Sequence, residues 1–118
     1  LDAPAAPPHS AMRALAEFDV RVAAALGIDF DIGPKLPKLF QAVGVADPQI
    51  KFFQPVFLSG RCKRFVEHTY AAHLPFLIEA GVASREEIET HLAALRSMND
   101  DETQAAAQFR LSQVWGRG

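Results

Sequence analysis

Residues 49–58 read Gln-Ile-Lys-Phe-Phe-Gln-Pro-Val-Phe-Leu and give the clearest strand signal in this chain of 118 residues. Branched and aromatic side chains dominate the segment, and these residue types are enriched in strands. Its apolar residues fall on both sides of the expected strand, with Ile50, Phe52, Val56 and Leu58 alternating against Phe53 and Phe57. Apolar residues on both sides are typical of a sheet that is covered on both faces. We therefore expect residues 49–58 to form a strand that is buried on both faces.

A second strand is indicated over residues 103–115, close to the end of the sequence. Apolar and polar residues alternate there, with Ala105, Ala107, Phe109 and Leu111 set against Gln104, Gln108, Arg110 and Ser112. This alternation is the period of a strand with one polar face.

Two helices are expected between these strands. The first covers residues 61–80 and ends at Gly81, and Pro75 inside it predicts a kink or a division into two shorter helices. Its expected buried side consists of Phe65, Val66, Tyr70, Leu74, Leu77 and Ile78. Ser84 and Glu87 then form a capping box, which predicts the start of the second helix.

Two further helices are expected before the first strand. Residues 11–26 carry apolar side chains at spacings of three and four, with Ser10 as the expected cap and Gly27 as the expected stop. A shorter helix ends at Gly44. Residues 1–10 are rich in proline, which restricts the backbone, so they are predicted to be an extended linker.

The amino-acid composition limits the classes of protein to which this chain can belong. With 49% hydrophobic and 22% charged residues, the chain has the composition of one compact domain. A net charge of −2 provides no basic field for nucleic acid or an anionic membrane. Cys62 is the only cysteine, and no apolar run is long enough to span a bilayer, so we expect a cytoplasmic protein. The first residue is Leu1 and not Met, which suggests either that the chain was cut from a longer protein or that its own first residues are not included.

Several short motifs stand at the ends of the expected elements. These are Asp-Ile-Gly-Pro-Lys-Leu-Pro at 31–37, Ala-Val-Gly-Val at 42–45, Glu-Ala-Gly-Val at 79–82 and Gln-Val-Trp-Gly-Arg at 113–117. Together with the order of helices and strands, they resemble the C-terminal part of class I S-adenosylmethionine-dependent methyltransferases. The resemblance covers nearly the whole chain.

This resemblance implies an α+β fragment of an α/β fold, with four or five helices and the two C-terminal antiparallel strands of a Rossmann-like sheet. Residues 1–10 would be the linker, and residues 11–118 would supply the substrate cover and the sheet edge. The family binds its cofactor on the first half of the sheet, through a glycine-rich turn and a later acidic residue. The seven glycines of this chain are scattered, mostly at helix ends. The S-adenosylmethionine site is therefore expected in the parent protein, and none in this chain alone.

The resemblance also implies residues that contact the substrate. Family members often place a histidine or tyrosine near the methyl acceptor, which makes Tyr70 and His73 candidates. Phe30 lies between two helices of the expected cover and is a candidate lining residue of an apolar substrate pocket. The competing interpretation for Tyr70 is ordinary packing against Leu74 and Leu77. No catalytic residue is assigned.

Two other groups of side chains have residue types that could form sites. His68 and His73 lie about 140° apart on the expected helix and have no cluster of cysteines or carboxylates to complete a zinc site, so no metal is predicted. Three cations, Arg61, Lys63 and Arg64, occupy the first turn of that helix, where they oppose the macrodipole. They are interpreted either as a contact for an acidic substrate or as a solvated cluster partly paired with Glu67.

The leading hypothesis is that the parent protein transfers a methyl group to a small apolar or aromatic acceptor, and that this segment is not catalytic alone. The alternative is a stand-alone interaction or regulatory domain that keeps the shape of such a C-terminus. A third hypothesis is a small helical enzyme unrelated to methyl transfer. Beyond the small-molecule substrate of the parent, we expect a homo-oligomer formed through exposed strand edges around Phe52, Phe53 and Phe57, and neither nucleic acid nor membrane as a partner.

Overall fold

The computed structural model describes residues 5–6 and 9–118, with side chains from residue 9 onward. In chain order the elements are β1 (Ala5–Ala6), α1 (Ser10–Leu26), the 3-10 turn η1 (Gly33–Lys35), α2 (Leu36–Ala42), β2 (Ala46–Phe53), β3 (Val56–Phe57), the 3-10 turn η2 (Arg61–Arg64), α3 (Phe65–Glu79), α4 (Arg85–Asp100), β4 (Ala105–Ala107) and β5 (Leu111–Arg117). The described chain is thus an α+β structure with two small antiparallel sheets, which confirms the expected class at that level.

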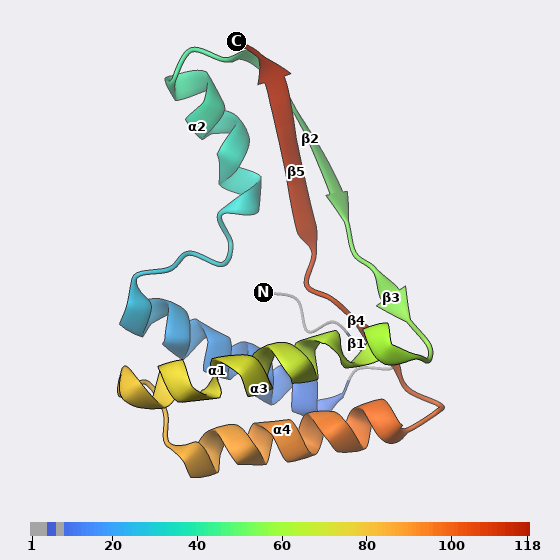
Figure 1. The fold of residues 1–118 in the computed structure, drawn as a ribbon. Helices are drawn as coiled ribbons and strands as arrows, with labels where there is room; N and C mark the ends of the chain where they lie inside the picture. The colour runs from blue at the N-terminus through green and yellow to red at the C-terminus, as the bar shows by residue number, and fades with distance from the viewer. Residues whose placement is uncertain (1–4, 7–8) are drawn as a thin grey trace.

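The elements form two parts, which Figure 1 shows one above the other. The base contains α1, α3 and α4 with the sheet β1-β4-β3, and the arm contains α2 with the sheet β2-β5. The molecule measures 46 × 35 × 20 Å along its principal axes, so the arm extends well away from the base. Within the described residues, no helix is both long and apolar enough to cross a bilayer.

The buried core lies in the base, where α1 packs against α4 and α3 packs on α4. One cluster of buried side chains contains Ala11, Met12, Leu15, Leu95, Met98 and Ala106. A second contains Phe18, Val22, Leu77, Ile88 and Leu92. Residues from α1 and α4 recur in both clusters at spacings of three and four, because such residues share one face of a helix. The apolar stripe predicted for residues 11–26 is confirmed.

The ends of the base helices are fixed by local hydrogen bonds. Ser84 Oγ accepts a hydrogen bond from the Glu87 amide at 3.2 Å, which confirms the predicted start of α4. Gly27 ends α1 in the left-handed conformation, at φ 68°. The start of α1 differs from the prediction by one residue, because His9 Nδ1 accepts from the Ala11 amide at 3.0 Å and Ser10 is already helical.

The long helix predicted over residues 61–80 is divided at its beginning and not at Pro75. Residues Arg61–Arg64 form the 3-10 turn η2, and α3 then continues through Pro75 to Glu79. Leu77 is buried and Val66, Tyr70, Leu74 and Ile78 are half-buried, but Phe65 is exposed, so its predicted burial is wrong. Val66 and the buried Glu67 occupy the core side of the first turn of α3, whereas Phe65 lines a surface cavity with His68 and Thr69.

The two predicted strands run antiparallel along their length, but each is broken at the same level. In the arm, the paired residues run from Ile50 opposite Val114 to Phe53 opposite Leu111. The pairing then stops, and it starts again with Val56 opposite Ala107. Residues 54–55 therefore face residues 108–110, so one strand carries an extra residue and the ribbon bends there. The Gln108 amide still donates to the Pro55 carbonyl at 3.0 Å. The single strands predicted over 49–58 and 103–115 are corrected to β2 with β3 and to β4 with β5.

Only one face of the arm sheet is covered. Helix α2 and η1 pack on the face that carries Ile50, Phe52, Ser112 and Val114. The opposite face is formed by the register pairs Gln49 with Trp115, Lys51 with Gln113 and Phe53 with Leu111. We call these six residues the open face, and all six are exposed. Burial of β2 on both faces was therefore a wrong prediction for the described chain, because nothing in it covers the second side.

The segment predicted to be a linker falls mostly outside the described residues. Its two described members, Ala5–Ala6, form β1 and pair antiparallel with β4, with Ala5 opposite Ala106. β4 is thus the middle strand of the base sheet, and its three alanines are buried.

Candidate functional site

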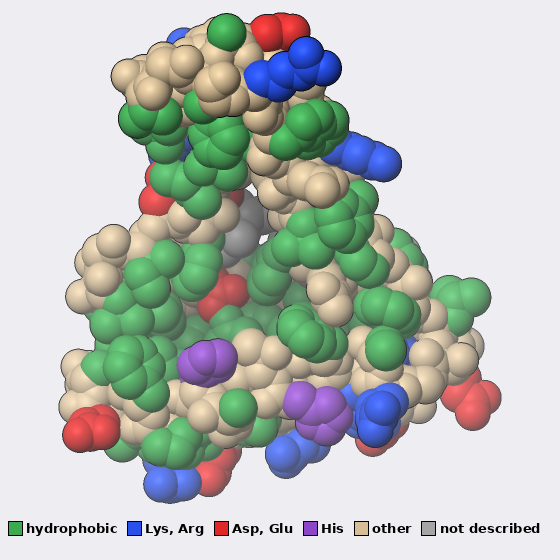
Figure 2. All heavy atoms as spheres, turned by 45° about the horizontal axis from the view of Figure 1, so that its top comes forward, with side chains coloured by type: hydrophobic (Ala, Val, Ile, Leu, Met, Phe, Trp, Pro, Cys, Tyr) green, Lys and Arg blue, Asp and Glu red, His purple; other side chains and the backbone are tan. Residues whose placement is uncertain are grey.

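The cavity that brings together distant parts of the sequence lies where the arm meets the base. It has a volume of about 230 Å³ and is lined by the segment after α1 and by the connection from β4 into β5. Its lining residues are Phe30, Asp31, Ile32, Gly33, Pro34, Leu36, Phe109, Arg110 and Ser112. We call it the arm cavity. Figure 2 shows that this side of the molecule is hollowed, with hydrophobic side chains around the hollow and an acidic side chain visible inside it.

Close backbone packing shapes the arm cavity. Turn η1 lies so near β5 that a Cβ on Gly33 would overlap Ser112 Oγ, so only glycine fits there. A hydrogen-bond pattern also fixes the segment before η1: Asp29 accepts from Lys35 Nζ at 2.5 Å and from the Asp31 amide at 2.9 Å. The Lys35 ammonium, and then the Asp31 amide, lower the pKa of the Asp29 carboxyl. The cavity wall is thus a structured turn held on the sheet.

One cation stands at the arm cavity. The guanidinium carbon of Arg110 lies 5.0 Å from the centre of the Phe52 ring, close enough for a cation–π interaction. Within the described residues, no carboxylate forms an ion pair with Arg110. The guanidinium of Arg110 therefore packs on an aromatic ring, and no described acid accepts hydrogen bonds from its N–H groups.

The structure places the three predicted substrate residues apart. Phe30 lines the arm cavity and is 45% exposed, and its role as a lining residue of a substrate pocket stays a prediction. Tyr70 is half-buried between both core clusters, with its ring 6.1 Å from that of Phe18. This favours the packing interpretation for Tyr70. Neither Tyr70 nor His73 lines the arm cavity.

His73 belongs to a second and more open cavity of about 470 Å³ along η2 and α3. Its imidazole Nδ1 lies 2.7 Å from the Thr69 carbonyl, a contact within its own helix. His68 and Cys62 line the same cavity, so the two histidines share a surface region despite their angular separation. Across residues 9–118, however, no three histidine, cysteine or acidic side chains converge as metal ligands.

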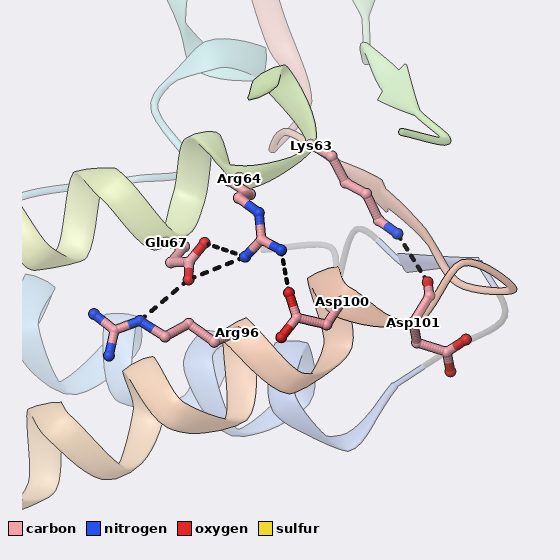
Figure 3. A network of polar contacts seen from close by, with 6 residues as sticks. All are labelled: Lys63, Arg64, Glu67, Arg96, Asp100 and Asp101. Atoms are coloured by element: carbon pink, nitrogen blue, oxygen red, sulfur yellow. Dashed lines mark hydrogen bonds and ion pairs between the residues drawn. The ribbon is translucent and has the colours of Figure 1, made fainter. Parts of the chain in front are cut away.

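The cationic cluster is a structural network, as Figure 3 shows. Arg64 Nη1 and Arg96 Nε lie 3.1 and 3.2 Å from the carboxylate of Glu67, which is buried. Arg64 also contacts Asp100, and the buried Lys63 donates from Nζ to the Asp101 carbonyl at 2.9 Å. The predicted pairing with Glu67 is confirmed for Arg64, but the predicted solvation of the cluster is wrong for Lys63. These contacts join η2 and α3 to α4 and engage Lys63 and Arg64 with the protein, while Arg61 is exposed.

Sequence reasoning missed Asp19, which is the most perturbed carboxyl group among the described residues. It lies in the buried stripe of α1 between Leu15 and Val22 and is only 5% exposed. Burial raises the pKa of Asp19 to about 7, because a charged carboxylate is disfavoured away from water. Among residues 9–118 it has no hydrogen-bond or ion-pair partner. An aspartate at an apolar position of a helical stripe was the signal that could have identified it.

Comparisons with known proteins leave the family open. No protein-family model, curated protein or solved structure matches this chain.

Proposed function

We propose that this chain is the C-terminal segment of an S-adenosylmethionine-dependent methyltransferase that acts on a small-molecule acceptor, and that it is not catalytic alone. The observation that carries the proposal is the antiparallel pairing of β2 with β5. These strands are far apart in sequence, and α3 and α4 lie between them in the chain. The resemblance implied this arrangement for the last two strands of the Rossmann-like sheet.

The exposed side of the arm also supports the proposal. Trp115, Phe53 and Leu111 on the open face are 48%, 47% and 42% exposed. A strand pair this apolar gains stability only when another layer covers it. In the proposed parent protein, the preceding part of the sheet and its helices would supply that cover.

The cofactor belongs to the preceding part of the proposed parent protein. A nucleotide-type ligand needs a glycine-rich turn where backbone can approach it closely. The glycines of this chain instead serve helix ends and the close packing of Gly33 and Gly116 in the arm. The proposal places the parent in the cytoplasm, where a single unpaired thiol such as Cys62 stays reduced.

We further propose that the isolated chain forms homo-oligomers through the free edges of the arm sheet and its open face. In a two-stranded sheet, β2 and β5 each leave one edge without a described partner. Unprotected edges pair readily with other chains. Self-association would then replace the cover that the parent protein supplies.

The coding sequence upstream of Leu1 provides the discriminating test. The methyltransferase proposal expects an open reading frame that continues upstream and encodes a glycine-rich turn after a strand, followed by an acidic residue. A start codon at or near residue 1 would instead favour a stand-alone interaction or regulatory domain.

A further inference from the structure

We infer that the arm cavity binds a small aromatic molecule that carries one carboxylate, and that Arg110 holds this carboxylate. Binding itself rests on the geometry of the cavity. Naming the ligand as the methyl acceptor also rests on the proposed function, whose acceptor class it would narrow.

The walls of the arm cavity offer apolar surface beside polar groups, which suits a ligand with an apolar body and a polar substituent. Ile32, Pro34 and Leu36 contribute aliphatic surface, and Phe30 and Phe109 contribute aromatic rings. Aromatic side chains favour stacked or edge-to-face contacts with another ring. A volume of about 230 Å³ is small for a ligand site, so it fits a single ring with a short substituent better than a larger molecule.

Arg110 favours a negatively charged substituent on the ligand. Its guanidinium is held over the Phe52 ring at 5.0 Å, which restricts the orientation of the planar fork without consuming its N–H donors. A guanidinium fork matches a carboxylate in geometry and forms charge-assisted hydrogen bonds. Ser112 adds a hydroxyl group to the same lining.

The single cation of the arm cavity limits how many negative charges a ligand can place there. Among the described lining residues, Arg110 is the only cation. One guanidinium fork matches one carboxylate, and a second carboxylate would find no further cation in the lining. A monocarboxylate is therefore favoured over a dicarboxylate.

Matched probes of one shape and different charge test the inference. The chain is titrated with phenylacetate and with its neutral analogue phenylacetamide, by calorimetry and by amide chemical-shift mapping. Phenylacetate is expected to bind about five- to tenfold more tightly, the size expected for a charge-assisted hydrogen bond that is partly exposed. The shifted amides should be those of residues 30–36 and 109–112.

Two variants assign the selectivity to Arg110. Arg110→Gln should bring the affinity for phenylacetate down to that for phenylacetamide, while Arg13→Gln, an exposed arginine on α1 away from the cavity, should leave the difference intact. Equal affinities for the two probes in the unchanged chain, shifts centred on the His73 cavity, or no saturable binding of phenylacetate would overturn the inference.

The outcome is separable from that of the proposed function. If the upstream sequence lacks a cofactor turn but phenylacetate binds as described, the methyltransferase proposal fails and the site stands. If the cofactor turn is present but phenylacetate does not bind, the acceptor class is wrong and the methyltransferase proposal stands.

Discussion

Asp19 shows how a single residue can set the pH dependence of the whole base. Its side chain takes a position that the helical pattern reserves for an apolar residue, between Leu15 and Val22. Burial keeps its proton bound to about pH 7 in the folded chain, whereas an unfolded aspartate releases it near pH 4. Because the folded state holds the proton over that interval, the free energy of unfolding decreases as the pH rises from about 4 to about 7.

The first prediction is that Asp19→Asn removes this decrease. The amide keeps the shape of the protonated carboxyl but does not ionise, so the variant should be more stable than the parent chain at pH 8, by about 1–3 kcal/mol. At pH 3.5 the two should be close. Urea unfolding at both pH values measures the difference. A parent chain whose stability does not fall between pH 4 and pH 7 would contradict the assignment.

A second prediction at the residue scale concerns Glu67, whose buried carboxylate receives Arg64 and Arg96. Glu67→Gln should lower the free energy of unfolding by about 1–3 kcal/mol, because the two guanidinium groups lose their charged acceptor. Glu89→Gln is the matched control, since Glu89 forms a 3.8 Å pair with Arg85 in which both side chains are exposed, and such pairs contribute little. Equal effects of the two substitutions would show that the network is not structural.

At the scale of elements, the helix ends could be predicted because their causes are local. Ser84 with Glu87, and Gly27, lie within a few residues of the backbone groups they fix. The bend at residues 54–55 also had a local signal in Pro55, which lacks an amide donor, but the apolar pattern on both sides of it concealed the break. Burial of β2 could not be predicted from its own residues, because it depends on what covers the open face.

Part of the candidate site could likewise be predicted from the sequence, and part could not. Phe30 could be proposed because an aromatic residue between two helices is a local feature. Sequence spacing could not place Arg110 and Ser112 beside Phe30. They reach the arm cavity through the long-range pairing of β5 with β2 and the bend at residues 108–110. Tyr70 and His73 lie on the same helix, yet Tyr70 faces the core and His73 faces the surface.

The prediction at this scale is that Ser84→Ala lowers the free energy of unfolding by about 0.5–2 kcal/mol, since α4 would lose its side-chain cap. Ser97→Ala, at an exposed position of the same helix, should have no destabilising effect, because alanine is the better helix former. Midpoints of urea unfolding compare the two. An unchanged midpoint for Ser84→Ala would mean that the 3.2 Å contact contributes nothing to the helix start.

At the scale of the whole molecule, the arm is the unusual feature. It carries exposed apolar side chains on its open face and extends from a base that has its own core. We expect the isolated chain to be a dimer or larger, joined through the arm. Phe53→Lys should reduce the mass toward that of a monomer, whereas Phe76→Lys, at an exposed position on α3, should not.

Light scattering over a concentration series measures this mass. A strictly monomeric mass at about 100 μM, where weak self-association is already populated, would contradict the prediction. Dispersed amide resonances from such a monomer would favour a stand-alone domain that is stable with an open arm.

We propose that this chain supplies the acceptor side of a methyltransferase whose cofactor site lies in a preceding segment. Titration calorimetry with S-adenosylmethionine tests it most directly, on the 118-residue chain and on the product of the full open reading frame. We expect the longer protein to bind with unit stoichiometry and this chain not to bind. Binding to the 118-residue chain tighter than about 100 μM, which corresponds to roughly 5–6 kcal/mol, or no binding by the longer protein, would contradict it.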